Sequence, residues 1–354
     1  MPPRKPTIRD VAHEAGVSVT TVSHALNEVK TARIKEETRR RVEKAAERLG
    51  YSPNGLARGL RKQRSQTLAF LSDRIVTTPY AGQIILGAQE KAAELGWVVT
   101  LYSTGENPEV EQREIRTLVE NQVDGVLYGA WYHRQVTVPP GLSGLPVVLV
   151  DCVTEDGSFS SVVPDEYGSG LSAVQELIDH GHRDIGFVTN VDDIPATRGR
   201  LQGYQDSLRD AGITFDSSMV VADVSETLGG YRTGLKLLTR SPRPSAIFAY
   251  NDRMAMGVYR AAYELNIRIP RELSVVSIDN QDIIADGLYP GLTTLALPHY
   301  EMGAWAVDHL IGRLRAQDAH EPEPPVEHVV LSCPIVRRHS IAAPLSAPRP
   351  IGDW

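Results

Sequence analysis

The chain has 354 residues, of which 42% are hydrophobic, so it is long enough for two or three packed units with sizeable cores. No run approaches about 18 consecutive apolar residues, which excludes a membrane-spanning helix. The net charge of −7 is unevenly spread, because the first 65 residues hold 15 of the 37 basic residues but only 7 of the 44 acidic ones. A small basic head on a large acidic body favours a polyanion partner that contacts the head alone. The alternative is a solvated, charged helical segment.

The start of the sequence and its cysteines indicate the cellular compartment of the protein. The basic start MPPRKP is not followed by an apolar segment, so we expect no secretory signal and a cytoplasmic protein. Cys152 and Cys333 lie far apart, and in that compartment they are expected to be reduced packing residues. The Cys, His and carboxylate spacings predict no metal site, and no cofactor is expected. The Pro-, Ala- and Ser-rich segment 341–354 predicts a flexible tail.

A helix-turn-helix unit is predicted near the start of the chain. Residues 7–15 favour a short helix, with Thr7 as N-cap and Asp10 in the capping-box position. Gly16 ends this helix, and Ser18 can cap a second helix over 19–26. Two short helices joined by a Gly-containing turn are typical of this unit. The outward side chains of the second helix are Val19, Thr20, Ser23 and His24.

A third helix is predicted over 36–49, with arginines and a lysine around an apolar stripe, and it ends at Gly50. Three stretches then resemble the DNA-binding head of the lactose-repressor (LacI/GalR) family: TIRDVAHEAGVSVTTVSHALN at 7–27, EETRRRVEKAAERLGYSPN at 36–54 and ARGLRKQRS at 57–65. The alternative is a helix-turn-helix used for protein contact. The charge asymmetry and the body of the chain favour DNA.

The resemblance implies how the head would contact DNA. Val19, Thr20 and His24 occupy the positions that read bases, and many relatives carry Arg where this chain has His24. An Arg fork can contact guanine through two hydrogen bonds, whereas a neutral His offers one donor and one acceptor, so a different operator sequence is expected. Phosphate contacts position the protein without specifying sequence. The remaining residues expected to contact DNA are Thr7, Ser18, Thr21, Ser23, Asn27 and Asn54.

Residues 52–65 are expected to form the hinge between a helix-turn-helix domain at 1–51 and the body. In relatives the hinge segment folds on the operator and wedges a leucine into the minor groove, and Leu60 is the matching residue. Gly55 and Gly59 each cost about 1 kcal/mol of helix propensity, so this hinge should be especially disordered without DNA. The alternative is a flexible linker with an incidental leucine.

From residue 67 onward, short apolar runs alternate with amphipathic helices. This alternation predicts parallel sheets covered on both faces, arranged as two Rossmann-like subdomains. The predicted strands are 68–71, 98–101, 125–128, 147–150, 185–188, 246–249 and 275–278, and the predicted helices are 82–95, 110–121, 168–180, 200–211, 228–239 and 253–265.

The body resembles the effector-binding core of the same family, and through it the periplasmic sugar-binding proteins. The matching stretches include ELIDHGHRDIGFVTN, RLQGYQDSLRDAGI and AIFAYNDRMAMGVYRAAYELNIRIPRELSVVSIDN. Crossings near 163–165, 291–294 and 325 would give an N-subdomain at about 66–164 and 294–325 and a C-subdomain at about 165–291 and 326–340. Ligands bind outside the carboxyl ends of strands in such folds, so a shared cleft is expected within 66–340.

The resemblance places the ligand contacts on Asp151, Arg200, Asn251 and Asp279, a set of donors and acceptors suited to sugar hydroxyls. Tyr80 and Trp131 are aromatic candidates for stacking, although packing is an equal alternative for any single aromatic residue. Val224 and Leu297 occupy positions where relatives often carry an aromatic or amide contact, so those roles are not transferred.

The sequence therefore predicts an all-α helix-turn-helix DNA-binding head and an α/β periplasmic-binding-protein-like body. The expected protein is not an enzyme but a homodimeric transcriptional regulator. It is expected to be a repressor that binds a palindromic operator in double-stranded DNA. A small effector, expected to be a sugar, would control this binding. Binding of the effector could either loosen or tighten DNA binding. The competing functions are a solute-binding protein and a sugar-active enzyme, but no G-x-S-x-G, Walker or G-x-G-x-x-G motif follows a predicted strand.

Overall fold

The computed structural model describes residues 6–26, 34–51, 64–74 and 82–345. The chain divides into two compact units, one formed by residues 1–67 with 121–124 and the other by 68–120 with 125–354. Each unit is described separately. No helix within the described ranges is long and apolar enough to cross a membrane.

The first unit contains the three predicted helices, α1 Ile8–Ala15, α2 Val19–Leu26 and α3 Glu36–Leu49. The backbone N–H and hydroxyl of Thr7 both donate to the Asp10 carboxylate at 2.7 Å, which fixes the start of α1. Gly16 and Gly50 follow α1 and α3 in the left-handed conformation that glycine adopts without strain. The three helices enclose a small apolar core that includes Val11, Val22, Val42 and Ala45. These signals explain why the helix bounds could be predicted from sequence.

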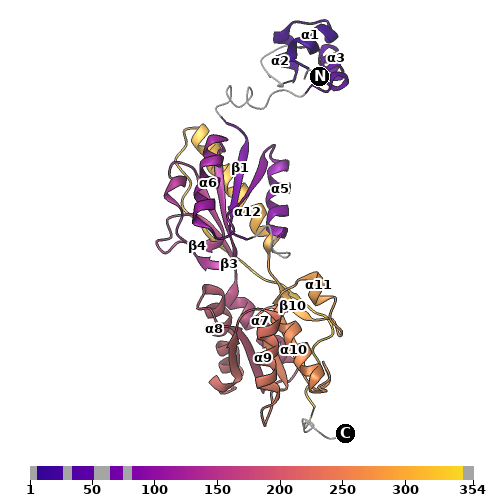
Figure 1. Ribbon diagram of the computed structural model, residues 1–354, viewed down its shortest axis with the longest axis vertical. Coiled ribbons are helices and arrows are strands. Elements are labelled where there is room, and N and C mark those ends of the chain that lie inside the picture. The colour runs from indigo at the N-terminus through magenta and orange to yellow at the C-terminus, as the bar shows by residue number, and fades with distance from the viewer. Residues whose placement is uncertain (1–5, 27–33, 52–63, 75–81, 346–354) are drawn as a thin grey trace. The chain divides into compact units, whose positions relative to one another are not determined.

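The second unit contains two six-stranded sheets, and the first has the order β11-β5-β4-β3-β1-β2. Its strand pairs β1–β3, β3–β4, β4–β5 and β5–β11 are parallel. Helices α5 and α12 pack together beside it (Figure 1). Its elements are β1 Thr67–Ser72, α5 Gly82–Glu94, β2 Val98–Ser103, α6 Pro108–Glu120, β3 Gly125–Gln135, the 3-10 helix Pro140–Leu142, β4 Val147–Val153, β5 Ser161–Pro164, α12 His299–Asp318 and β11 His328–Leu331.

The second sheet has the order β12-β10-β9-β8-β6-β7, and only its edge strand β12 is antiparallel to its neighbour. Phe187 and Phe248 stack at 4.5 Å between ring centroids in its core. Its elements are α7 Glu166–Asp179, β6 Ile185–Asn190, α8 Pro195–Asp210, the 3-10 helix Ser217–Met219, β7 Val220–Asp223, α9 Thr227–Leu238, β8 Ala246–Ala249, α10 Asp252–Glu264, β9 Ser274–Asp279, α11 Asp282–Ala285, β10 Thr293–Ala296 and β12 Ile335–Val336.

Two of the three chain crossings lie later than the sequence indicated. The crossing expected near 291–294 falls after β10, because Thr293–Ala296 pairs with β9 in the second sheet. The crossing expected near 325 falls after β11, because His328–Leu331 pairs with β5 in the first sheet. Residues 294–296 therefore belong with the C-subdomain, and residues 328–331 belong with the N-subdomain. The first crossing lies between β5 and α7, within the expected range.

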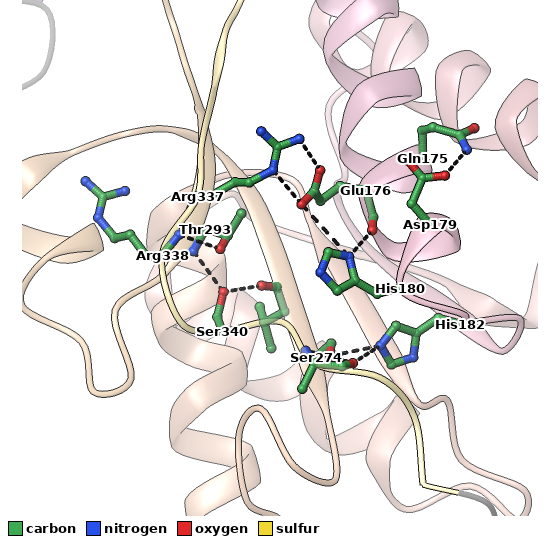
Figure 2. A network of polar contacts seen from close by, with 12 residues as sticks. Gln175, Glu176, Asp179, His180, His182, Ser274, Thr293, Arg337, Arg338 and Ser340 are labelled. Carbon is green, nitrogen blue, oxygen red and sulfur yellow. Dashed lines mark hydrogen bonds and ion pairs between the residues drawn. The ribbon is translucent and has the colours of Figure 1, made fainter.

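After β12 the chain returns along the second sheet and is fixed by polar contacts (Figure 2). The Arg337 guanidinium donates to both carboxylate oxygens of Glu176 on α7, at 2.9 and 2.7 Å. Buried His182 contacts the Ser274 hydroxyl at 2.9 Å and the Ala342 carbonyl at 2.8 Å. Burial lowers the pKa of His182, which is consistent with a neutral, structural histidine.

Close helix packing in the second unit depends on pairs of glycines. A Cβ on Gly170 of α7 would collide with the backbone of Arg200 on α8, and a Cβ on Gly203 would collide with the backbone of Tyr167 on α7. The pairs α5–α12 and α9–α10 have the same reciprocal arrangement, through Gly87 with Gly303 and Gly230 with Gly257. These helix backbones therefore approach to a distance that leaves no room for side chains.

Candidate functional site

A polar cavity lies in the second unit, where side chains from both sheets meet. Its walls come from the carboxyl ends of β3, β4, β6, β8 and β9 and from the chain crossings after β5 and β10. Its volume, as the space that the centre of a water molecule can reach, is about 110 Å³, and part of the cavity is open to solvent. Its lining includes Trp131, His133, Asp151, Glu166, Asn190, Arg200, Asn251, Arg253, Asp279 and His299.

A buried ion pair forms one wall of the cavity. Glu166 and Arg200 are 6% and 3% exposed, and Arg200 Nε donates to Glu166 Oε2 at 2.6 Å. Arg200 Nη1 donates to the Tyr250 carbonyl at 2.6 Å, and the guanidinium lies 4.4 Å from the centroid of the Tyr250 ring. Burial alone would raise the pKa of Glu166, but Arg200 and His133 outweigh it and hold that pKa below its ordinary value. Glu166 is therefore a carboxylate at neutral pH.

Asp151 has a different environment on β4. Its side chain is buried, and its Oδ1 has no hydrogen-bond partner among the described residues. Burial raises the pKa of Asp151 to about 7, because the low-dielectric surroundings disfavour its charged form and His133 compensates only in part. Its backbone has φ of 56°, a left-handed conformation that costs energy in a non-glycine residue and is found preferentially at functional sites.

Asn251 and Asp279 are held by bonds within the second sheet. Asn251 caps α10 by accepting from Met254 N at 2.9 Å, and its Nδ2 donates to the Ser225 carbonyl at 3.1 Å. Asp279 accepts from Gln281 Nε2 at 2.7 Å, and burial raises its pKa to about 6. The neighbouring Asp252 is buried behind the cavity and accepts from Ser277, Thr294 and the Gln281 backbone N–H. Hydrogen bonds within the protein therefore hold the side chains of Asn251 and Asp279 in place without a ligand.

Several polar atoms of the lining have no hydrogen-bond partner within the described chain. They are one donor, Trp131 Nε1, two acceptors, Asp151 Oδ1 and Asn190 Oδ1, and the ring nitrogen His133 Nδ1, which lies 3.8 Å from Glu166 Oε1. Buried polar atoms without partners are costly, so a site that collects both donors and acceptors is suited to a ligand with several hydroxyl groups. Among the described residues, no group of three or more His, Cys, Asp or Glu is arranged to hold a metal ion.

The cavity brings together five of the six residues expected to bind the effector: Trp131, Asp151, Arg200, Asn251 and Asp279. Tyr80 lies outside the described residues. Sequence reasoning missed Glu166, His133 and Asn190. Asn190 could have been suspected, because it directly ends a strand, as Asp279 does. Glu166 gave no signal, because its partner Arg200 is 34 positions away.

In the first unit, α2 presents its outward side chains as expected. Val19 is 40% exposed, Thr20 is exposed and His24 is half-buried. The hydroxyls of Ser18 and Thr21 bond to each other at 2.9 Å, and Ser18 Oγ also caps α2 by accepting from Thr21 N at 3.0 Å. Ser23 is half-buried, and the hydroxyl of Thr7 donates a hydrogen bond to the Asp10 carboxylate. Asn27, Asn54 and Leu60 lie outside the described residues.

A helix-turn-helix unit joined to two parallel-sheet lobes around a polar cavity defines a class: ligand-responsive DNA-binding regulators. Residues 7–54 match the family of bacterial regulatory proteins, lacI family, and residues 174–341 match the periplasmic binding protein-like domain. The chain is 32% identical over 310 residues to the ribose operon repressor of Escherichia coli (strain K12), covering 87% of this chain and 93% of that protein. It is equally identical over 324 residues to the HTH-type transcriptional repressor PurR of Proteus mirabilis (strain HI4320), covering 90% and 93%.

Solved structures are similar over nearly the whole chain. The complex of the transcriptional regulator CelR with cellobiose matches at a TM-score of 0.67 and 29% identity, covering 95% of this chain and 99% of that one. The lac repressor dimer bound to operator and the anti-inducer ONPF matches in fold at a TM-score of 0.77, with 23% identity and 96% and 100% coverage. The chain belongs to the lacI family of bacterial regulatory proteins and is a DNA-binding transcriptional regulator.

Proposed function

We propose that this protein is a cytoplasmic repressor that binds a palindromic operator as a homodimer and releases it when a polyhydroxylated ligand, a sugar, fills the cavity. The observation that carries this proposal is the cavity itself. Its lining offers buried carboxylates, an amide, a guanidinium and an aromatic donor, several of them with unpartnered atoms. Relatives that bear on the ligand are the ribose operon repressor and the CelR–cellobiose complex.

In the proposed complex, α2 enters the major groove. Val19 and Thr20 are exposed near the start of α2, where base edges are met in helix-turn-helix proteins. His24 lies one turn further along the same helix and is the third proposed base-reading residue. Thr7, Ser18, Thr21 and Ser23 are proposed to contact phosphates together with Asn27 and Asn54, and Leu60 is proposed to enter the minor groove.

The proposed ligand contacts are Asp151, Arg200, Asn251 and Asp279, with Trp131 and Tyr80 as aromatic candidates for stacking on the sugar. Closure of the cavity around the ligand would change the position of the two lobes relative to each other. A ligand shifts DNA affinity only by its differential affinity for the two conformations, and a coupling of about 1–3 kcal/mol is typical.

Exposed apolar residues in the second unit support the proposed homodimer. Ile283 on α11 is 84% exposed, and Tyr289 shortly after α11 is 97% exposed. Large apolar side chains at such exposure are often interface residues when they gather in one segment. Two copies related by a two-fold axis would place two α2 helices on inverted half-sites.

The proposal is tested by footprinting the full chain on DNA upstream of its own gene, with and without added sugars. We expect protection of two inverted half-sites, a steep loss of affinity with salt, and release by at least one sugar. Asn251→Ala and Asp279→Ala should bind operator normally but lose the response to that sugar. Protection of a single half-site by a monomer would overturn the proposal, and full ligand response in both variants would overturn the cavity assignment.

We also propose that the protein is not an enzyme. A set of Asp and Arg side chains in a cleft resembles that of sugar-active enzymes, so the purified protein is assayed for hydrolysis of the sugar that releases DNA. Turnover of that sugar would indicate an enzyme. Binding of the sugar together with no binding to any DNA fragment would instead indicate a solute-binding protein.

A further inference from the structure

The charge balance of the cavity points to the chemical class of the ligand. Four carboxyl groups line it, those of Asp151, Glu166, Asp192 and Asp279, against the guanidinium groups of Arg200 and Arg253. Arg253 donates to Glu226 at 2.7 Å, and Arg200 donates to Glu166 at 2.6 Å. Both cationic side chains are therefore already compensated by a glutamate of the protein.

The nitrogen atoms of the Arg200 guanidinium are also engaged in hydrogen bonds within the protein. Guanidinium groups hold phosphates and carboxylates through two parallel N–H donors. In this cavity Nε donates to Glu166 and Nη1 donates to the Tyr250 carbonyl, so two of the three nitrogen atoms are already engaged. A forked contact with an anionic ligand would have to displace one of two buried bonds.

We propose that Glu166 is a specificity-determining residue, which occupies Arg200 and makes this cavity select uncharged polyols over their phosphorylated or carboxylated derivatives. The inference rests on the proposed function, because it concerns the ligand of the same cavity. Glu166 acts on the ligand both through its own charge and by restricting the donors of Arg200. An uncharged sugar loses nothing by this arrangement, since the unpartnered atoms of Trp131, Asp151 and Asn190 still serve its hydroxyl groups.

The size of the effect follows from Coulomb's law. Removing one negative charge at about 6 Å from an anionic ligand, in an effective dielectric of about 20, changes the ligand's affinity by about 100-fold for each negative charge that the ligand carries. The affinity of an uncharged ligand should change far less. Glu166→Gln makes this change with little alteration of shape, because a glutamine oxygen can still accept from Arg200 Nε.

Glu176→Gln is a matched control on the same helix. Glu176 is also a buried glutamate, and it is paired with Arg337 (Figure 2). It lies ten residues after Glu166 on α7, which corresponds to about 15 Å along the helix axis. It does not line the cavity. Both variants therefore change the net charge of the protein equally, but only Glu166→Gln changes the charge at the site.

The test compares wild type and the two variants by calorimetric titration with ribose, glucose and cellobiose and with ribose 5-phosphate and glucose 6-phosphate. We expect wild type to bind an uncharged sugar at least 100-fold more tightly than its phosphate. Glu166→Gln should narrow that ratio by at least about 100-fold, while Glu176→Gln keeps the wild-type ratio. Tighter binding of the phosphorylated sugar by wild type, or an unchanged ratio in Glu166→Gln, would overturn the inference.

A second measurement does not depend on the identity of the sugar. Thermal unfolding is followed in millimolar inorganic phosphate against potassium chloride of equal ionic strength. Phosphate should stabilise Glu166→Gln more than wild type or Glu176→Gln, and equal shifts in all three proteins would refute the role of Glu166. Neither measurement contains DNA, so a failure of operator binding or release refutes the proposed function while the anion comparison still tests this inference.

Discussion

Asp151 makes the stability of the protein depend on pH in a way that one substitution should remove. Its pKa is about 7 in the folded protein because of burial, against an ordinary value of 3.8. At pH values below about 4 the carboxyl group is protonated in both the folded and the unfolded chain, and it contributes no pH dependence. As pH rises further the unfolded chain ionises first, so the free energy of unfolding falls until the folded group ionises near pH 7.

The magnitude follows from the two pKa values. The cost of Asp151 relative to an uncharged side chain grows by about 2.5 kcal/mol between pH 5 and pH 8. Asp151→Asn cannot ionise, so it should gain about this much in unfolding free energy relative to wild type over that interval. Asp279, with a pKa of about 6, titrates in both proteins and contributes to both curves.

The assay is urea denaturation of the full chain at pH 5, 6, 7 and 8, followed by tryptophan fluorescence. Asp156→Asn is the control, because hydrogen bonds from the Ser158 backbone and hydroxyl lower the pKa of this exposed aspartate, which stays ionised throughout. Its difference from wild type should be constant with pH. A constant difference for Asp151→Asn as well would refute the argument that Asp151 is protonated by burial.

Three further predictions concern DNA binding and assembly. His24→Arg should change the preferred base at one symmetric half-site position, with a discrimination of about 1–3 kcal/mol, and identical motifs from a randomised-site selection would count against base reading by His24. Leu60→Ala should reduce operator affinity and bending without changing sugar binding, and unchanged bending in a gel-phasing experiment would contradict the wedge role. Ile283→Asp and Tyr289→Asp should each shift the protein toward monomer in sedimentation equilibrium, because a charge would be buried at the interface. Wild-type dimerisation of both variants would place the interface elsewhere.

The elements that sequence predicted well are those with local signals. In the head, the capping pair Thr7 and Asp10 marks the start of α1, and Gly16 and Gly50 mark the ends of α1 and α3. Each signal lies within a few residues of the helix end that it sets. Buried strands such as β4 and β9 appear as apolar runs because both faces of a parallel sheet are covered. In each case the residues that cause the helix or strand to form lie within that element or directly beside it in the sequence.

The elements that sequence missed depend on partners far along the chain. Strand β10 has the sequence TTLA, and its place in the second sheet is set by pairing with β9 and by Thr294, which donates to Asp252 at 2.7 Å. The same holds for the site. Arg200 could be predicted from its position, but its bond to Glu166 could not, because no spacing rule joins residues on two different helices.

The glycine contacts between α7 and α8 limit how this cavity could change its ligand over evolution. Glu166 and Arg200 each lie close to a helix glycine, since a Cβ on Gly199 would meet Glu166 Cβ at 2.8 Å and a Cβ on Gly170 would collide with the Arg200 backbone. Neither helix can slide or rotate to reposition one partner without a steric clash. A lineage that acquires an anionic effector would therefore have to replace the side chain at 166 while Arg200 and both glycines stay.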